Sequence, residues 1–106
     1  MMADKTIKIE FYLPAKTKTG SDIDPARVNA IINQIWPKYR GGTKMAGTGY
    51  YRKQSGENEI ADSFVLAVVT SYSNSLEIDL NSFKEKIKKE LNQEDVLITW
   101  HFIEVF

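Results

Sequence analysis

The side chains best able to do chemistry are few, and the sole histidine, His101, is the first of them. It lies between Trp100 and Phe102 near the carboxyl end of the sequence. An imidazole can act as a general base near neutral pH, but it usually needs a partner that orients it. At a spacing of two residues its neighbours are Thr99 and Ile103, which cannot do this. His101 is therefore the one candidate catalytic residue, although a lone histidine more often has a structural role.

Several kinds of active site are excluded by residues that the sequence lacks. It has no cysteine, so disulfides, thiolate metal sites, iron–sulfur clusters and cysteine nucleophiles are absent. It has no Gly-x-Ser-x-Gly motif and no acidic loop with the spacing of a calcium site. We therefore expect no metal and no cofactor. The sequence leaves enzymatic activity open and favours its absence.

The most distinctive stretch runs from Lys38 to Lys53 and contains four of the six glycines, with no acidic residue. Glycine amides can approach a phosphate, but a phosphate loop follows a strand and opens a helix. Here the glycines follow a helical pattern and precede a strand predicted at Thr48–Lys53. We interpret Gly41 or Gly42 as a helix C-cap and the residues between it and Thr48 as a flexible entry into the strand. Within the strand, Tyr51 and Arg52 are candidate ligand-binding residues.

The elements around this stretch are predicted from periodicity and capping. Thr6–Leu13 alternates in polarity, which is typical of a strand with one buried face. Asp24-Pro25 predicts a helix start, and an apolar stripe with helical spacing follows it. The remaining predicted elements are a doubly apolar strand, a second helix and a long last strand, at Ser63–Thr70, Leu80–Asn92 and Val96–Phe106 respectively.

The order strand, helix, strand, strand, helix, strand predicts an α+β, ferredoxin-like βαββαβ sandwich. Right-handed crossovers give a four-stranded antiparallel sheet of order 4-1-3-2, with two helices on one face. The 106 residues fit a single domain, residues 1–106. The amino terminus has no apolar signal core, and no apolar run is long enough to span a bilayer, so we expect a cytoplasmic protein.

Charge is balanced overall but uneven along the chain. Residues 25–55 contain six basic and no acidic side chains, and residues 54–83 contain five acidic and no basic ones. The basic stretch is either an anion-binding patch or one half of a mutual neutralisation. The topology favours neutralisation, because it places the glycine-rich connection at the same end of the sheet as the Ser71–Asp79 loop. A net charge of zero, and a third strand without the aromatic signature of RNA-recognition motifs, argue against nucleic acid as a partner.

Several motifs resemble those of a family of small bacterial proteins catalogued as a domain of unknown function. They are Ile-Glu-Phe-Tyr-Leu in the first strand, Trp36-Pro37 at the end of the first helix, and Gly-Thr-Gly-Tyr-Tyr at Gly47–Tyr51. The Ser-Phe-Val-Leu-Ala-Val-Val strand and the Gln93-Glu-Asp-Val-Leu segment complete the resemblance. It implies a ferredoxin-like fold and no particular reaction.

The sheet face opposite the helices is the main clue to function. The first strand puts Lys8, Glu10 and Tyr12 on it, and we expect the third and fourth strands to add bulky apolar groups. Such a face suits a homodimer in which two sheets pack together around a partly wet cavity, as in dimeric α+β barrels. We therefore predict a homo-oligomeric binding or interaction module that uses this face or its edge strands, with a small molecule allowed as ligand. The candidate ligand-binding residues are Tyr12, Tyr51, Arg52, Trp100 and His101.

The alternative function is a small cofactor-free oxygenase or isomerase. Its pocket would lie over the sheet, with His101, Tyr12 or Tyr51 as the polar groups. No convincing acid–base pair supports it, and no membrane partner is expected.

Overall fold

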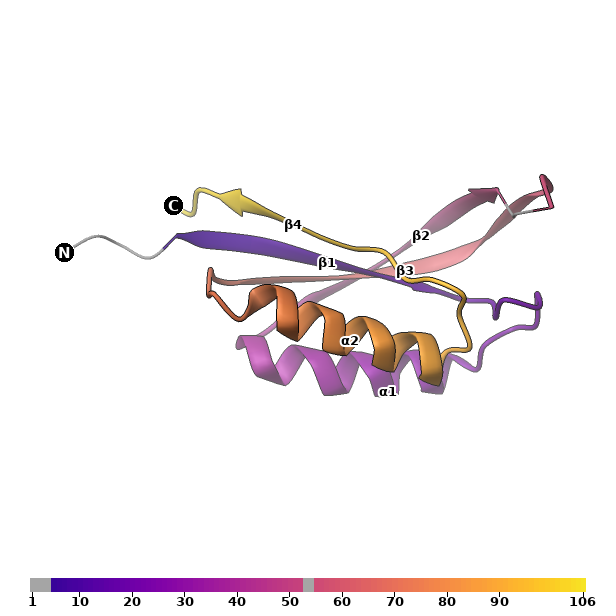
Figure 1. Cartoon of the computed structure of the whole chain (residues 1–106), viewed down its shortest axis with the longest axis horizontal. Coiled ribbons are helices and arrows are strands. Elements are labelled where there is room, and N and C mark those ends of the chain that lie inside the picture. The colour runs from indigo at the N-terminus through magenta and orange to yellow at the C-terminus, as the bar shows by residue number, and fades with distance from the viewer. Residues whose placement is uncertain (1–4, 53–54) are drawn as a thin grey trace.

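The computed structural model describes residues 5–52 and 55–106 of the chain. It contains one antiparallel sheet of order β2-β3-β1-β4, with two α-helices on one face (Figure 1). The elements are β1 Thr6–Pro14, α1 Pro25–Ile35, the 3₁₀ helix η1 Trp36–Tyr39, β2 Thr43–Arg52, β3 Asn58–Ser71, α2 Leu76–Glu90 and β4 Ile98–Ile103. This order is 4-1-3-2 reversed, so the predicted fold class and sheet order are confirmed.

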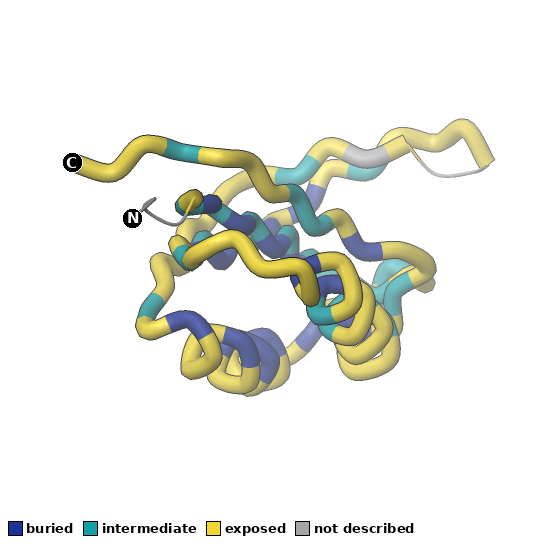
Figure 2. Tube along the Cα trace, turned by 60° about the vertical axis from the view of Figure 1, so that its left-hand side comes forward, coloured by how far each residue is buried: buried dark blue, intermediate teal, exposed yellow. Residues whose placement is uncertain are grey.

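The core lies between the central strand β1 and the two helices. Ile7, Ile9, Phe11 and Leu13 of β1 are completely buried, and the residues between them are half-buried. This alternation follows from the strand's period of two, which sends every second side chain toward the helices. Figure 2 shows the buried residues gathered on the facing sides of β1 and the helices. The predicted buried face of the first strand is confirmed.

Helix α1 begins as the sequence predicts. The Asp24 side chain accepts a hydrogen bond from the Ala26 amide at 2.9 Å, and Pro25 occupies the first turn. Pro37 ends the α-helix in the 3₁₀ turn η1. The residue in the left-handed conformation after η1 is Arg40, with φ 63°, so the predicted C-cap at Gly41 or Gly42 is wrong by one or two residues.

Helix α2 starts one turn earlier than predicted, at Leu76 instead of Leu80. Leu76 is buried against the core, and this tertiary contact extends the helix toward its amino end by one turn. The N-cap is Ser75, whose hydroxyl donates to Asp79 Oδ2 at 3.1 Å. Past the carboxyl end, Leu91 is completely buried and Asn92 has φ 50°, which turns the chain toward β4.

The strand predicted at Thr48–Lys53 starts five residues earlier in the structure, which corrects the flexible entry predicted for the residues before Thr48. β2 begins at Thr43, and Gly47 and Gly49 pair with Ser63 and Ala61 of β3. Pairing of β2 with residues 58–67 of β3 holds these glycines extended despite their low strand propensity. The resulting hairpin projects beyond the helices, and the longest dimension of the molecule is 52 Å (Figure 1). β3 is correspondingly longer than predicted, whereas β4 is shorter and ends at Ile103.

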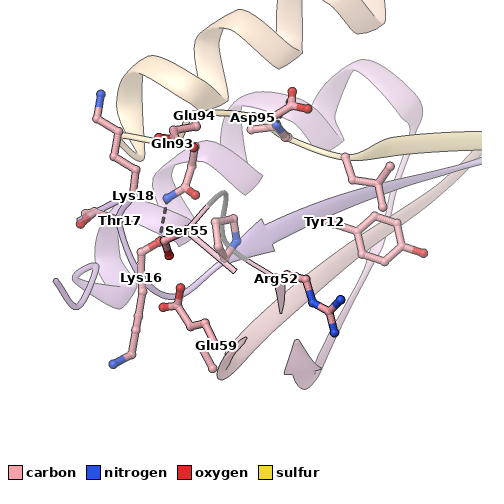
Figure 3. A pocket seen from close by; sticks show the side chains of 14 residues that line it. Tyr12, Lys16, Thr17, Lys18, Arg52, Ser55, Glu59, Gln93, Glu94 and Asp95 are labelled. Atoms are coloured by element: carbon pink, nitrogen blue, oxygen red, sulfur yellow. Dashed lines mark hydrogen bonds between the residues drawn. The ribbon is translucent and has the colours of Figure 1, made fainter. Parts of the chain in front are cut away.

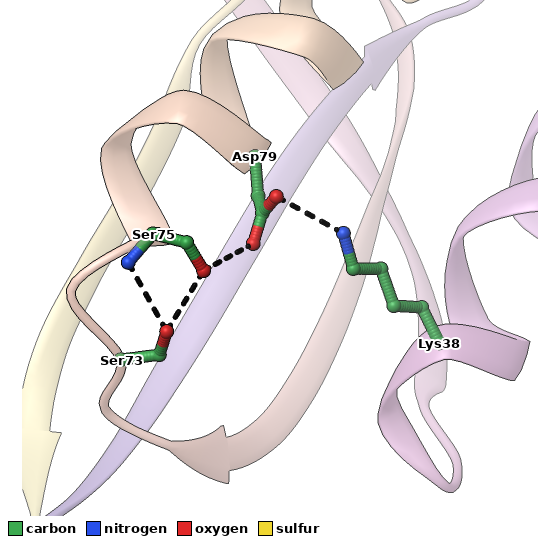
Figure 4. A network of polar contacts seen from close by, with 4 residues as sticks. All are labelled: Lys38, Ser73, Ser75 and Asp79. Carbon is green, nitrogen blue, oxygen red and sulfur yellow. Dashed lines mark hydrogen bonds and ion pairs between the residues drawn. The ribbon is translucent and has the colours of Figure 1, made fainter.

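The basic segment after α1 and the acidic segment at the start of α2 lie at the same end of the sheet, as expected, and an ion pair joins them. Lys38 Nζ lies 3.2 Å from Asp79 Oδ1, and Asp79 also accepts from Ser75, which contacts Ser73 (Figure 4). The pair joins the end of η1 to the first turn of α2. No helix among residues 5–52 and 55–106 is long and apolar enough to cross a membrane.

Candidate functional site

The face of the sheet without helices, which we call the open face, carries an apolar stripe. Residues directly opposite each other in a sheet share a face. Lys8, Glu10 and Tyr12 of β1 oppose Val69, Ala67 and Val65 of β3, and Val65 in turn opposes Met45 of β2. Val69 is 48% exposed and Met45 is 42% exposed. We call Met45, Val65, Ala67 and Val69 the open-face stripe.

The fourth strand contributes less to the open face than expected. Ile103 and Thr99 lie on it, opposite Thr6 and Glu10. Trp100 and Phe102 oppose the buried Ile9 and Ile7, so they lie on the helix side of the sheet. The expectation of bulky apolar groups on the open face therefore holds for β3, but in β4 only for Ile103.

Trp100 and Phe102 form an aromatic cluster with Tyr72, which follows β3. The three ring centroids are 5.4 to 5.7 Å apart. All three side chains are at least 40% exposed, because the helices do not extend over this end of the sheet.

A cavity of about 440 Å³ lies at the opposite end of the sheet. Three segments surround it: the end of β1 with the loop after it, the β2–β3 hairpin, and the loop from α2 to β4 (Figure 3). We call it the end pocket. Its lining residues are Tyr12, Pro14, Lys16, Thr17, Lys18, Arg52, Ser55, Glu59, Ala61, Gln93, Glu94, Asp95, Val96 and Leu97.

Backbone hydrogen bonds join the two loops of the end pocket. The Lys18 amide donates to Asn92 O at 2.9 Å, and the Tyr12 amide donates to Leu97 O at 3.0 Å. Gln93 Nε2 donates to Lys16 O at 2.7 Å and to Leu91 O at 2.8 Å. The amide side chain of Gln93 thus spans both loops, and the two walls hold each other in place.

The charged side chains of the end pocket differ in their partners. Asp95 accepts from Lys84, with an Nζ–Oδ1 distance of 3.0 Å, and from its neighbour's amide, Val96 N. The hydrogen bond from Lys84 is the main reason why the pKa of Asp95 is lowered. Lys16 pairs with Asp22 at 3.7 Å. In Figure 3 the Lys16 and Lys18 side chains extend away from the space between Tyr12 and Glu59.

Arg52 enters the pocket from the last residue of β2. Its Nε donates to Asn58 Oδ1 at 3.3 Å, directly across the hairpin. Within the described residues, its two terminal nitrogens make no hydrogen bond or ion pair. They are therefore available to a ligand, as is the ring of Tyr12 on the same side of the view in Figure 3.

The structure places the five predicted ligand-binding residues at two ends of the sheet. Tyr12 and Arg52 line the end pocket, Trp100 belongs to the aromatic cluster, and His101 is exposed on the open face opposite Lys8. Tyr51 pairs with Glu59 in the strand register, and its side chain lies outside the described part of the structure. His101 does not line the end pocket, so the structure does not bring it together with Tyr12. Gln93 was missed by sequence reasoning, and its only signal was the polar run Gln93-Glu94-Asp95 before the last strand.

Over the described ranges, no group of three acidic or histidine side chains could hold a metal ion.

Comparisons with known proteins give a fold and no family. No family model matches the sequence, and no curated protein matches it by sequence. Among solved structures, a phage SAM lyase in complex with S-methyl-5'-thioadenosine is similar, with a TM-score of 0.73 and 11% identity over 96% of this chain and 84% of that one. The same phage enzyme in its apo state gives a TM-score of 0.67 and 12% identity over the same shares.

A Bacillus cereus protein related to NIF3 has a TM-score of 0.68 and 11% identity. The match covers 99% of this chain but only 27% of that protein, so the likeness concerns one part of it. At these identities the comparisons support the α+β fold alone. The chain is a small α+β protein whose function is not established.

Proposed function

We propose that this protein is a homo-oligomeric binding module in which a second copy covers the open face and a small molecule occupies the end pocket. The observation that carries the proposal is the position of Tyr12. It opposes Val65 of the open-face stripe and also lines the end pocket, so the two surfaces are continuous. A partner on the open face would lie directly beside the pocket's mouth.

The composition of the open face supports a second copy as the partner. The stripe is apolar and partly exposed, and contiguous apolar surface of this kind is usually an interaction site. It is flanked by one cationic and one anionic residue, Lys8 and Glu10, both on β1. In a two-fold arrangement the same patch faces itself, which lets Lys8 of one copy approach Glu10 of the other. We also propose that the protein is cytoplasmic and belongs to the bacterial family of unknown function that its sequence resembles.

Light scattering of the wild-type protein over a range of concentrations tests the assembly. We expect a mass of two or more chains at micromolar concentrations. A single-chain mass at the highest concentration reached would contradict the oligomer.

The second candidate is a small enzyme, and the phage SAM lyase with the same fold is what favours it. The cofactor-free oxygenase or isomerase predicted from the sequence has lost support, because His101 is exposed and away from the end pocket. SAM and S-methyl-5'-thioadenosine are the first compounds to test. SAM incubated with the protein is analysed by chromatography beside a sample of SAM without protein. If the protein only binds, both samples should contain the same amount of S-methyl-5'-thioadenosine. An excess in the sample with protein would establish the enzyme.

A further inference from the structure

We propose that the end pocket takes a zwitterionic ligand of the amino-acid class, whose carboxylate binds Arg52 and whose cationic group faces Gln93 and Glu94. The proposal rests on the proposed function, which makes this pocket a small-molecule site. The proposed function names only a small molecule, and the present proposal adds the chemical class of that ligand.

The charges around the end pocket balance. Among the described lining residues, three are basic, Lys16, Lys18 and Arg52, and three are acidic, Glu59, Glu94 and Asp95. A site for a phosphate or another polyanion would have an excess of basic groups, and a site for a polyamine an excess of acidic ones. Equal numbers suit a ligand that carries one charge of each sign.

Arg52 is the group suited to the ligand's carboxylate. Its Nε is engaged by Asn58, which holds the guanidinium plane, while the terminal nitrogens have no partner among the described residues. Two parallel N–H groups in one plane match the two oxygens of a carboxylate. Lys16 is less suited, because its ammonium pairs with Asp22 outside the pocket.

The opposite wall offers acceptors for a cationic group. Gln93 uses its amide nitrogen for Lys16 O and Leu91 O, which fixes the orientation of the amide and leaves Oε1 as an acceptor. Glu94 makes no side-chain hydrogen bond or ion pair within the described ranges, and it lies on the same loop. Asp95 is already held by Lys84. An ammonium group therefore finds Gln93 and Glu94 as its partners.

Apolar surface lies between these two polar walls. The ring of Tyr12 and the side chains of Pro14, Ala61, Val96 and Leu97 line the cavity. Leu97 is 58% exposed, so its side chain is accessible to a ligand in the cavity. The body of the ligand should accordingly be apolar or aromatic.

Three probes that share one aromatic body separate the possibilities. L-phenylalanine carries both charges, 3-phenylpropionate carries only the carboxylate, and phenethylamine carries only the ammonium. Amide chemical shifts of the ¹⁵N-labelled protein report the site and the affinity of each. We expect L-phenylalanine to shift the amides of residues 93–97 and to bind roughly tenfold or more tightly than either single-charge probe, since a charge-assisted hydrogen bond is worth at least that factor.

Arg52→Gln is the matching variant, with Lys89→Gln as control because Lys89 is an exposed lysine on α2 that does not line the pocket. Arg52→Gln should weaken L-phenylalanine and 3-phenylpropionate about tenfold and leave phenethylamine unchanged, and Lys89→Gln should change none. Equal affinity for all three probes, or an effect of Arg52→Gln on phenethylamine alone, would overturn the assignment. Binding of S-methyl-5'-thioadenosine without L-phenylalanine would overturn the ligand class while leaving the proposed function intact. A pocket that responds to no probe, in a protein that is also a single-chain monomer, would reject both.

Discussion

Lys38 and Asp79 are 41 positions apart in sequence, and their side chains meet at 3.2 Å. The pair joins the basic segment to the acidic segment, so the uneven charge along the chain becomes a local neutralisation in the fold. It also sets the electrostatic surroundings of Tyr39, because Asp79 is one of the two causes that raise the pKa of this tyrosine.

The first prediction concerns the strength of this ion pair. Both side chains are partly exposed, 47% for Lys38 and 31% for Asp79, so their coupling should be modest, about 0.2–1 kcal/mol. Asp79→Asn should cost more than Lys38→Gln, since Asp79 also lies in the first turn of α2, where a negative charge is favourable. Urea unfolding of both single variants and the double variant gives the coupling energy. Because the pair is partly exposed, the coupling energy should decrease at high salt. A coupling energy that salt does not change would contradict this prediction.

The second prediction concerns the hydroxyl of Tyr39, which is buried without a hydrogen-bond partner among the described residues. Burial, and then Asp79, raise its pKa to about 12. A raised pKa for a phenol means that the fold favours the neutral form, so this contribution to stability is complete below the unfolded pKa of about 10 and is lost between about pH 10 and 12. Tyr39→Phe should leave the free energy of unfolding unchanged or slightly raised at pH 7. Above pH 10 the stability of this variant should fall less steeply with pH than that of the wild type. Unfolding free energies of both proteins from pH 8 to 12 measure this, and parallel curves would refute it.

The third prediction compares two glycines of the same stretch. A methyl group added at Gly42 would lie 3.0 Å from Leu66 Cδ1 and 3.1 Å from Val68 Cγ1, whereas one added at Gly47 would meet nothing within 4 Å. Gly42→Ala should therefore destabilise the fold by about 1–3 kcal/mol. Gly47→Ala should be neutral or stabilise it by about 0.4–1 kcal/mol, because it restricts the unfolded chain. Thermal unfolding of the two variants is the measurement. Equal changes in stability would contradict the prediction, because they would mean that the close contacts around Gly42 have no effect.

The sequence was sufficient to predict the fold because its signals there are local. The alternation of Ile7, Ile9 and Phe11 and the Asp24-Pro25 cap depend on neighbours within a few residues, and each has the expected structure. The start of α2 and the length of β2 were mispredicted because tertiary contacts decide them. Leu76 extends the helix by packing into the core, and pairing with β3 holds Gly47 in a strand.

The site could be predicted only in part, for the same physical reason. Tyr12 and Arg52 could be named because their strands and residue types suggest a binding role. Gln93 could not, because its place in the end pocket depends on the meeting of two loops 77 residues apart in sequence, where its side-chain amide donates to Lys16 O. The position of Trp100 likewise depends on the register of β4 against β1, which places it opposite Ile9.

The fourth prediction tests the central claim, that a second copy covers the open face. Val69→Lys places a charge in the open-face stripe, and Ile78→Lys makes the same kind of change at a residue of α2 that is 74% exposed and lies off the sheet. Both positions are exposed, so neither change should unfold the protein. Sedimentation velocity of the two variants and the wild type should give an oligomer for the wild type and Ile78→Lys, and a single chain for Val69→Lys. An oligomer that survives Val69→Lys unchanged, or one that Ile78→Lys dissociates instead, would contradict the account.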